Sequence, residues 1–542
     1  MANSNFFRGS PLLMGDNTTP GLRIPEELLG LIPQIKDECK EFGLDTYPTV
    51  VQMLTYDEIS EVAAYGGFPV RFPHWKWGME YEELQRGYEH GMHRIFEMVI
   101  NTNPCYIYCL DSNTVVDNVT VIAHALGHND FFKNNIYFAP TSDNALNQLA
   151  NHGTRIRRYM ARWGKEKVQN FIDNVLRIET LIDPHAAWER KVYHDPVIHD
   201  TRKYIHPARL PVKDGHEHME PYINPDEWRR EQNERIERQY RAEELEIFAE
   251  PTRDVMKFIR DHANLKPWQS DIVAMIYEEA MYFAPQRTTK MLNEGWASYV
   301  DHNIMAKRML CGLGQDRHDC GIVEYAIHKM GVLGGKYSMN PYKLGFTIFS
   351  DIEERWDKGR FGREYEDCDD ARQREDWDTH TGLGHEKVLE VRKFYNDFTV
   401  LAEFFTDEFC TKYEFFEWKK YPNGEYRIEC RDPKRIRKKL IRRHLNGGLP
   451  EIKLVDPNHR NLNYLFLQHI WDGRPLLPGY AHAVLQSLCF LWGKPVILAT
   501  RSKDGEEIVY ICFGSDDDQV MVRTRKDYEQ ENGKIPPPEE EE

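Results

Sequence analysis

The sequence lacks the features that mark membrane, secreted and disulfide-bonded proteins. It has no apolar run near the roughly 20 residues that a helix needs to cross a bilayer, and its first 20 residues show no basic region followed by an apolar stretch, as a signal peptide would. The ten cysteines are scattered over 542 residues without a Cys-x-x-Cys pair, which argues against a zinc ribbon and against a disulfide framework. We therefore expect a cytoplasmic protein whose thiols are reduced.

Signatures of nucleotide-dependent enzymes and of serine hydrolases are also missing. There is no phosphate-binding loop of the Walker type, no Gly-x-Gly-x-x-Gly fingerprint and no Gly-x-Ser-x-Gly elbow. The formal net charge of −17 argues against a general nucleic-acid binder and against adhesion to anionic membranes.

One segment departs from this acidic balance. Residues 434–444, KRIRKKLIRRH, carry seven Lys and Arg side chains within ten positions. Such a basic helix can dock phosphates, nucleic acid or an acidic partner, or it can face solvent beside the acidic remainder of the protein. Because the chain as a whole is acidic, we favour the solvated face or a protein partner over nucleic acid.

The spacing of apolar residues predicts a mainly helical N-terminal part. With 542 residues, of which 41% are apolar, the chain is long enough for two or more domains with sizeable cores. CYIYCL at 105–110 predicts a buried strand, and helical periodicity predicts helices at 24–42, 80–99, 117–132, twice within 144–182, at 268–283 and at 287–309. Residues 183–262 first lose periodicity and then become strongly charged, so we expect an insertion there.

The C-terminal part has a different pattern. EYRIEC at 425–430 predicts a strand, and PVILATR and IVYICFG predict two paired strands around the turn Lys503-Asp504-Gly505. We therefore predict a mainly α core domain at 24–395 and a smaller α+β domain at 396–530. Residues 1–23 are expected to form a flexible arm, and residues 531–542 a disordered acidic tail.

Two histidines in VTVIAHALGHNDFFKNN, His124 and His128, are the first candidate functional residues. Four positions apart on a helix, their side chains project from one face and can share a metal ion, although such pairs are also common as structural or surface pairs. The neighbouring residues are apolar, which predicts a buried helix whose imidazoles need partners. Gly127 costs about 1 kcal/mol in a helix relative to Ala, which indicates close approach by a neighbouring backbone.

The segment LNEGWASYVDH, which contains Glu294, resembles the glutamate-bearing helix of the gluzincin aminopeptidases, Leu-Asn-Glu-Gly-Phe-Ala-Ser-Tyr. In that group the glutamate binds zinc, and the other two protein ligands come from a His-Glu-x-x-His helix. The resemblance implies a zincin-like helical site in the core domain, where His124, His128 and Glu294 hold a divalent metal, with zinc favoured, and leave one coordination position open. The alternative is that Glu294 caps or bridges two core helices.

The chain departs from the gluzincin pattern at the general base. Ala125 stands where His-Glu-x-x-His has its glutamate, so peptide hydrolysis by the usual route lacks its proton acceptor. Asp130, Asp301 and His302 are the remaining candidates for a base, and each of them fits a capping or ligand-supporting role better. His216-Glu217-His218 in the expected insertion is a second candidate metal motif, but histidines in loops are usually solvated, and a lid over the central site is its favoured role.

Several long motifs resemble the stage V sporulation protein R (SpoVR) family. They are NTNPCYIYCL, AHALGHNDFFKNN, LNEGWASYVDH, NPYKLGFTIFSDIEERWD, FYNDFTVLAEFFTDEF and LCFLWGKPVIL, and the similarity spans roughly residues 25–500. The founding member of that family is needed for normal spore cortex formation. Relatives are commonly encoded beside a PrkA-type serine kinase and a von Willebrand A-like protein. The resemblance therefore implies a cytoplasmic stress or sporulation factor with these two proteins as candidate partners.

Two functional hypotheses follow from these residues. In the first, the protein is a degenerate or atypical metallohydrolase with a divalent metal at His124, His128 and Glu294. In the second, the metal is structural and the protein is a non-catalytic regulator or scaffold. The missing base favours the second hypothesis, whereas an open coordination position would favour the first.

Overall fold

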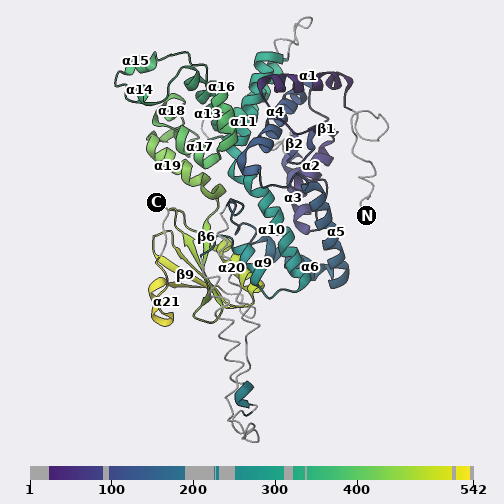
Figure 1. Ribbon diagram of the computed structural model, residues 1–542, viewed down its shortest axis with the longest axis vertical. Helices are drawn as coiled ribbons and strands as arrows, with labels where there is room; N and C mark the ends of the chain where they lie inside the picture. Colours follow the sequence, from purple (N-terminus) through teal and green to yellow (C-terminus); the bar gives the residue numbers. More distant parts are fainter. Residues whose placement is uncertain are drawn as a thin grey trace, which may run out of the picture. The chain divides into compact units, whose positions relative to one another are not determined.

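The computed structural model describes residues 24–89, 97–188, 225, 227–230, 251–309, 321–335, 339–514 and 520–537 (Figure 1). The chain forms two compact units, each built from two separate stretches. Unit 1 comprises Met1–Arg162 and Tyr282–Gly448, and unit 2 comprises Trp163–Met281 and Leu449–Glu542. The fold is mainly helical with an α+β C-terminal part, as predicted, and that part contains a five-stranded sheet.

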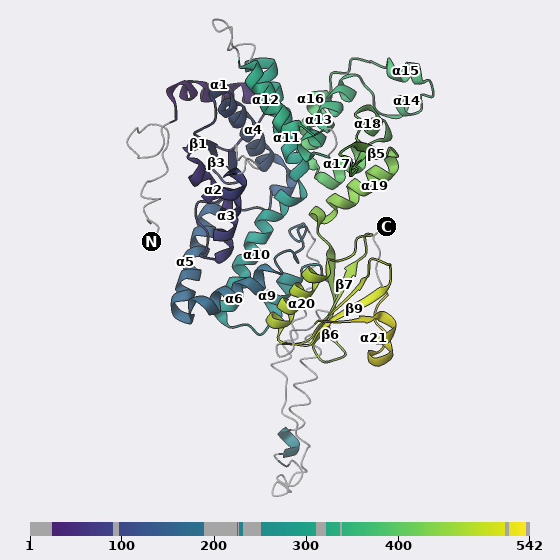
Figure 2. The same cartoon turned by 180° about the vertical axis from the view of Figure 1, so that it is seen from behind.

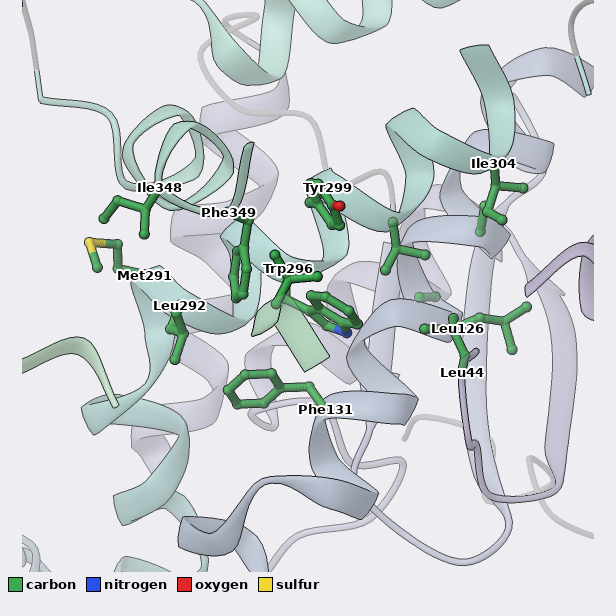
Figure 3. Packing of buried hydrophobic residues seen from close by; sticks show 14 of the residues in the cluster. Leu44, Leu126, Phe131, Met291, Leu292, Trp296, Tyr299, Ile304, Ile348 and Phe349 are labelled. Atoms are coloured by element: carbon green, nitrogen blue, oxygen red, sulfur yellow. The ribbon is translucent and has the colours of Figure 1, made fainter. Parts of the chain in front are cut away.

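Three helices form the centre of unit 1. Helix α11 (Lys290–Ile304) packs on α4 (Val115–Asn134) and on α13 (Pro341–Asp357). Trp296 and Tyr299 of α11 are fully buried, and Figure 3 shows them together with Phe131 of α4 and Phe349 of α13. Three further helices pack around this centre, namely α1 (Glu26–Phe42) against α4, α12 (Ile322–Leu333) against α4 and α13, and α16 (Gly384–Phe394) against α13.

Glycines bring these helices unusually close. A β-carbon on Gly127 would lie 2.9 Å from the Cα of Ala297, which confirms the close approach expected at that position. A β-carbon on Gly295 would lie 2.4 Å from the Cα of Gly345. Helix α11 is therefore in contact with backbone on both sides, and its distance from α4 and α13 is set by residues with little or no side chain.

A small sheet packs against α4 in the same unit. Its strands are β1 (Thr49–Leu54), β2 (Glu97–Ile100) and β3 (Cys105–Leu110), in the order β1-β3-β2, with β1 parallel and β2 antiparallel to β3. The strand predicted at 105–110 is confirmed. The prediction of a helix at 80–99 was wrong at its C-terminal end. Helix α3 spans Trp75–Glu89, and Met98, Val99 and Ile100 pair with β3.

Residues 396–448 also belong to unit 1, so the domain boundary expected at 395 lies inside a compact unit. The physical reason is burial, since Val400, Leu401 and Phe404 join the same hydrophobic cluster as Trp296. The other elements of unit 1 are α2 (Tyr56–Ala64), α5 (Ala145–Trp163, whose last residue is in unit 2), α14 (Arg363–Glu366), α15 (Ala371–Glu375), α17 (Asp397–Phe404), α18 (Asp407–Lys412), β4 (Glu417–Lys420), β5 (Tyr426–Cys430) and α19 (Pro433–His444).

Unit 2 contains the five-stranded sheet, with strand order β10-β9-β8-β7-β6. Helix α20 (Pro478–Trp492) connects the parallel strands β7 and β8, and all other neighbours are antiparallel, including the predicted β8–β9 hairpin. The strands are β6 (Glu451–His459), β7 (Tyr464–Ile470), β8 (Val496–Arg501), β9 (Glu507–Cys512) and β10 (Val520–Thr524). The helices are α6 (Lys165–Leu176), α9 (Val255–His262), α21 (Arg525–Asn532) and α10 (Pro267–Thr288), which continues into unit 1.

The C-terminal segment is ordered further than expected. Ile535 is buried in the cluster under α21, and the carbonyl oxygen of Pro537 accepts a hydrogen bond of 2.7 Å from Nε2 of Gln468. The tail predicted to be disordered from 531 thus docks on unit 2 as far as 537. Residues 538–542, the arm 1–23 and most of the expected insertion 183–262 lie outside the described residues, whereas α9 at the end of that insertion is part of unit 2.

Replacing Gly295 with Ala tests the close contact between α11 and α13. The new methyl group would meet the backbone of Gly345, which cannot move without displacing α13, so we expect a loss of about 3 kcal/mol in the free energy of unfolding. Gly30→Ala in α1 is the matched control, because nothing lies within 4 Å of the place that its new methyl group would occupy, and there we expect no loss, or a gain of up to about 1 kcal/mol. Equal unfolding midpoints for the two variants would contradict the close packing.

The buried His469 of β7 predicts a pH dependence in unit 2. Burial lowers the pKa of His469 to about 4, and its Nδ1 lies 2.8 Å from Oγ1 of Thr500. The unfolded chain binds a proton near pH 6.5, so between about pH 6.5 and 4 it holds more protons than the folded protein. Folding with a neutral His469 is therefore least costly where the unfolded chain is also neutral. The free energy of unfolding is highest above pH 6.5 and falls by at most about 3 kcal/mol as the pH is lowered towards 4. Unfolding curves of His469→Gln should show less of this loss than wild type, while the exposed His380→Gln should behave as wild type does.

Candidate metal centre

The two histidines lie one turn apart in the buried middle of α4. The helix begins with a reciprocal capping box between Thr114 and Asp117, and every residue from Asn118 to Phe132 is buried. His124 is 7% exposed and His128 is 6% exposed. Their ring centroids are 4.7 Å apart, with the rings nearly perpendicular at 81°. The buried middle of α4 thus presents both imidazoles to α11.

Helix α11 places Glu294 opposite the histidines. Its N-terminus is held by the buried Asp397 of α17, whose carboxylate oxygens accept hydrogen bonds from the backbone N–H groups of Met291 (2.9 Å) and Leu292 (2.8 Å). Such an acceptor satisfies N–H groups that a helix start leaves unpaired. One side of α11 then contacts α4 at Gly127, and the other contacts α13 at Gly345.

The three predicted ligand side chains therefore come together. Oε2 of Glu294 lies 3.4 Å from Nε2 of His128 and 3.6 Å from Nε2 of His124. One ligand atom from each residue lies within 4.8 Å of the other two, an arrangement that could hold a metal ion. The side chain of Glu294 is 18% exposed, compared with 9% and 8% for the histidines, so the glutamate is the most exposed of the three.

The second nitrogen of each ring has its own acceptor. Nδ1 of His124 lies 2.8 Å from Oδ2 of Asp301, and Nδ1 of His128 lies 2.9 Å from Oδ1 of Asn293. A carboxylate only accepts hydrogen bonds, so Nδ1 of His124 carries the proton, and in the neutral ring Nε2 is the atom with the lone pair. Metal-binding histidines have outer partners of this kind, which fix the orientation of the ring.

The charged groups of the site compensate one another. Burial opposes ionisation of Glu294, but the imidazoles of His128 and His124, when protonated, outweigh it and hold the pKa of Glu294 well below its usual range. Asp301 is 2% exposed, and burial likewise opposes its charge. Lys329 and His124 reverse this effect, so the pKa of Asp301 is lowered. Both carboxylates are therefore ionised at neutral pH.

The candidate bases lie elsewhere or have other partners. Asp130 points away from the cluster and accepts hydrogen bonds from the backbone of Asp45 (2.8 Å) and from Nε1 of Trp296 (3.0 Å), with Arg392 at 3.4 Å. Burial raises the pKa of Asp130 to about 6, although Arg392 acts in the opposite direction. Asp301 is bound to His124, as described above.

His302 follows Asp301 on α11, and its Nδ1 is 3.4 Å from the hydroxyl of Tyr325. Ala125 is fully buried and offers no acceptor. Within the described ranges, His124, His128 and Glu294 are the one group of three side chains with metal-ligand spacing. His194, His199, His206, His216 and His218 lie outside the described residues.

Three residues of this site were not singled out from the sequence, namely Asn293, Lys329 and Asp397. Asn293 had a local signal, because it directly precedes Glu294 in the motif. Lys329 and Asp397 had none, since their contacts join segments that are far apart in the chain. The basic segment predicted at 434–444 is confirmed as helix α19, which buries Ile436 and Leu440 and exposes most of its cations to solvent.

Replacing Asp397 with Asn tests how the glutamate helix is held. The amide keeps one acceptor oxygen but removes the charge from two buried hydrogen bonds, so we expect a loss of about 1–3 kcal/mol in the free energy of unfolding. Asp370→Asn is the matched control, because Asp370 also accepts from two backbone N–H groups, of Arg372 and Gln373, but is exposed. Denaturant titrations showing equal losses for the two variants would contradict the role of burial.

Comparison with known proteins places the chain in a family. The model of the SpoVR like protein family matches residues 24–449, and that of the SpoVR-like C-terminal domain matches residues 450–503. An uncharacterized protein of Escherichia coli (strain K12), YcgB, is 26% identical over 511 residues, which is 89% of this chain and 93% of that protein. None of the solved structures matches.

Two further observations accompany these matches. Among the residues that the structure describes, no helix combines the length and the apolar character needed to span a membrane. The second family model begins at residue 450, next to the point where the chain enters unit 2 for the second time at Leu449. The two models together match nearly the whole chain, including all the residues of the candidate metal centre. The chain therefore belongs to the SpoVR family.

Proposed function

We propose that this protein binds a divalent metal ion, zinc, through His124, His128 and Glu294, and that it acts as a metal-dependent regulatory protein rather than as a peptidase. The observation that carries the proposal is the convergence of one carboxylate oxygen and two imidazole nitrogens, whose other ring nitrogens are directed to Asp301 and Asn293.

The spacing of these atoms supports a metal. Zinc–ligand bonds of 2.0–2.1 Å in tetrahedral geometry separate neighbouring ligand atoms by roughly 3.3–3.4 Å, and Oε2 of Glu294 lies 3.4 and 3.6 Å from the two Nε2 atoms. A charge-assisted hydrogen bond would be shorter, at about 2.7–2.9 Å. Two nitrogen ligands and one oxygen ligand favour zinc or a neighbouring transition metal over magnesium or calcium, which prefer oxygen.

The residues around the centre support a role other than hydrolysis. A metal bound here would supply Lewis acidity to a ligand at its open position. The chain's own groups then have to accept a proton, and Ala125 has none to offer, while Asp130 and Asp301 are engaged by other partners. The centre instead joins α4 to α11, two helices whose sequence positions are far apart, so the bound ion would reinforce the core of unit 1.

The regulatory role extends to partners by family resemblance. We propose that the protein works in a stress or sporulation response together with a PrkA-type serine kinase and a von Willebrand A-like protein. An atypical metallohydrolase is the second candidate. The 18% exposure of the Glu294 side chain favours it, because a small substrate can approach the centre from that side.

Metal analysis of the purified protein tests the proposal. Wild type should contain about one equivalent of zinc per chain, and His128→Ala and Glu294→Gln should each lose most of it. Zinc should also raise the unfolding midpoint of the metal-free wild type, since a ligand that binds the folded state at 100 times its Kd adds about 2.7 kcal/mol. His152→Ala, which removes another buried histidine of unit 1, should keep its zinc. Wild type without stoichiometric metal, or ligand variants that retain it, would refute the site.

A further inference from the structure

Helix α12 is folded with its polar side inward. Four of its outward side chains are large and apolar, and these residues, Ile322, Val323, Ile327 and Met330, are between 54% and 75% exposed. Its inward side chains are polar, and Tyr325 and Lys329 are 7% and 9% exposed. A surface helix normally does the reverse and buries its apolar stripe. Burial of an apolar stripe therefore does not explain the orientation of α12, although the ring of Tyr325 joins the hydrophobic cluster of unit 1.

The inward side chains of α12 contact the two helices of the metal centre, beside which α12 lies in Figure 2. Nζ of Lys329 lies 2.7 Å from Oδ1 of Asp301 and 3.3 Å from the carbonyl oxygen of Ser298, both on α11. Nδ1 of His328 lies 3.1 Å from Oδ1 of Asp117 on α4, and the hydroxyl of Tyr325 lies 3.4 Å from Nδ1 of His302 on α11. Polar contacts with α4 and α11 thus replace apolar burial.

Asp301 connects α12 to the centre itself. One of its carboxylate oxygens accepts from Lys329 and the other faces Nδ1 of His124. A carboxylate buried to 2% exposure is costly unless a cation compensates it, and the ammonium of Lys329 does so while fixing the rotation of the carboxylate. His128 differs, because its Nδ1 faces the neutral amide of Asn293.

We propose that Lys329 is a positioning residue of the metal centre, which orients His124 through Asp301, and that this contact couples the packing of α12 to metal binding. The proposal rests on the metal binding proposed above. Because coupling between two equilibria is reciprocal, zinc stabilises the inward orientation of Lys329, and displacement of α12 weakens zinc binding by the same factor. The apolar side chains of α12 are then held at the surface in proportion to metal occupancy.

Zinc affinity, measured by competition with a chromophoric chelator, tests the positioning role. Lys329→Met should bind zinc about 10- to 100-fold more weakly than wild type, as expected when an outer partner of a ligand is lost. Lys329→Arg, which keeps the cation, should recover most of the affinity. A purely electrostatic role predicts the opposite sign, because removing a positive charge near a cation strengthens binding. Unchanged or tighter binding by Lys329→Met would therefore overturn the proposal.

Lys412→Met is the matched control, since it removes a lysine of unit 1 that pairs with Asp351 and Glu354 of α13. Its zinc affinity should equal that of wild type. Equal weakening in Lys412→Met and Lys329→Met would show general loss of structure and count against a specific role of Lys329.

Hydrogen exchange of α12 separates this proposal from the proposed function. Zinc should slow amide exchange in residues 321–333 of the wild type and leave exchange in Lys329→Met unchanged. If wild type binds no zinc, the proposed metal function fails. Hydrogen exchange of the metal-free proteins then still tests whether Lys329 holds α12 in place. Faster exchange of α12 in Lys329→Met than in wild type and Lys412→Met would support the contact of Lys329 with Asp301 as the link between α12 and α11. Equal exchange in all three proteins would overturn it.

Discussion

The architecture of unit 1 depends on the close packing of α11 between α4 and α13. Gly127 faces Ala297 on one side, and Gly295 faces Gly345 on the other, so the helix backbones approach to distances that larger side chains would prevent. Trp296 and Tyr299 fill the space around this contact with the largest fully buried side chains of the described chain. Since Glu294 directly precedes Gly295, the same contact that sets the helix spacing also sets the distance from the carboxylate to the histidines.

Around this packing, four buried or largely buried carboxylates of unit 1 lie against polar or charged groups. Glu294 faces two imidazoles, and Asp301 lies between His124 and Lys329. Asp130 accepts a hydrogen bond from Trp296 and pairs with Arg392. Asp397 accepts hydrogen bonds from two backbone N–H groups. Buried ionised groups are costly when alone and specify one arrangement when fully paired. The core of unit 1 is therefore held by apolar contacts between helices and by a polar layer that selects a single register between them.

Local sequence patterns indicated several of the elements and the three side chains that meet at the candidate metal centre. Two histidines four positions apart indicate one helix face, a motif with a known relative indicates Glu294, and alternating apolar residues indicate the β8–β9 hairpin. Patterns of this kind could not reveal Lys329 or Asp397, because their contacts depend on where distant helices meet. Helix α12 is the clearest case, since amphipathic periodicity would assign Ile327 and Met330 to the core, and both are exposed. The boundary near 395 failed for a related reason, as burial of Val400 and Leu401 in the helical core overrides the change in composition.

The discontinuous construction of both units has a consequence for biosynthesis. His124 and Asp301 are 177 positions apart, and a ribosome adding about 5–20 residues per second needs roughly 10–35 s to reach the second after the first. During that interval the nascent chain carries α4, a helix whose entire middle is buried in the folded protein, without α11, which is one of the elements that cover it. Unit 2 likewise begins with α6 and is completed after residue 449. The growing polypeptide therefore carries α4 for that time with the face that α11 later covers still exposed to solvent.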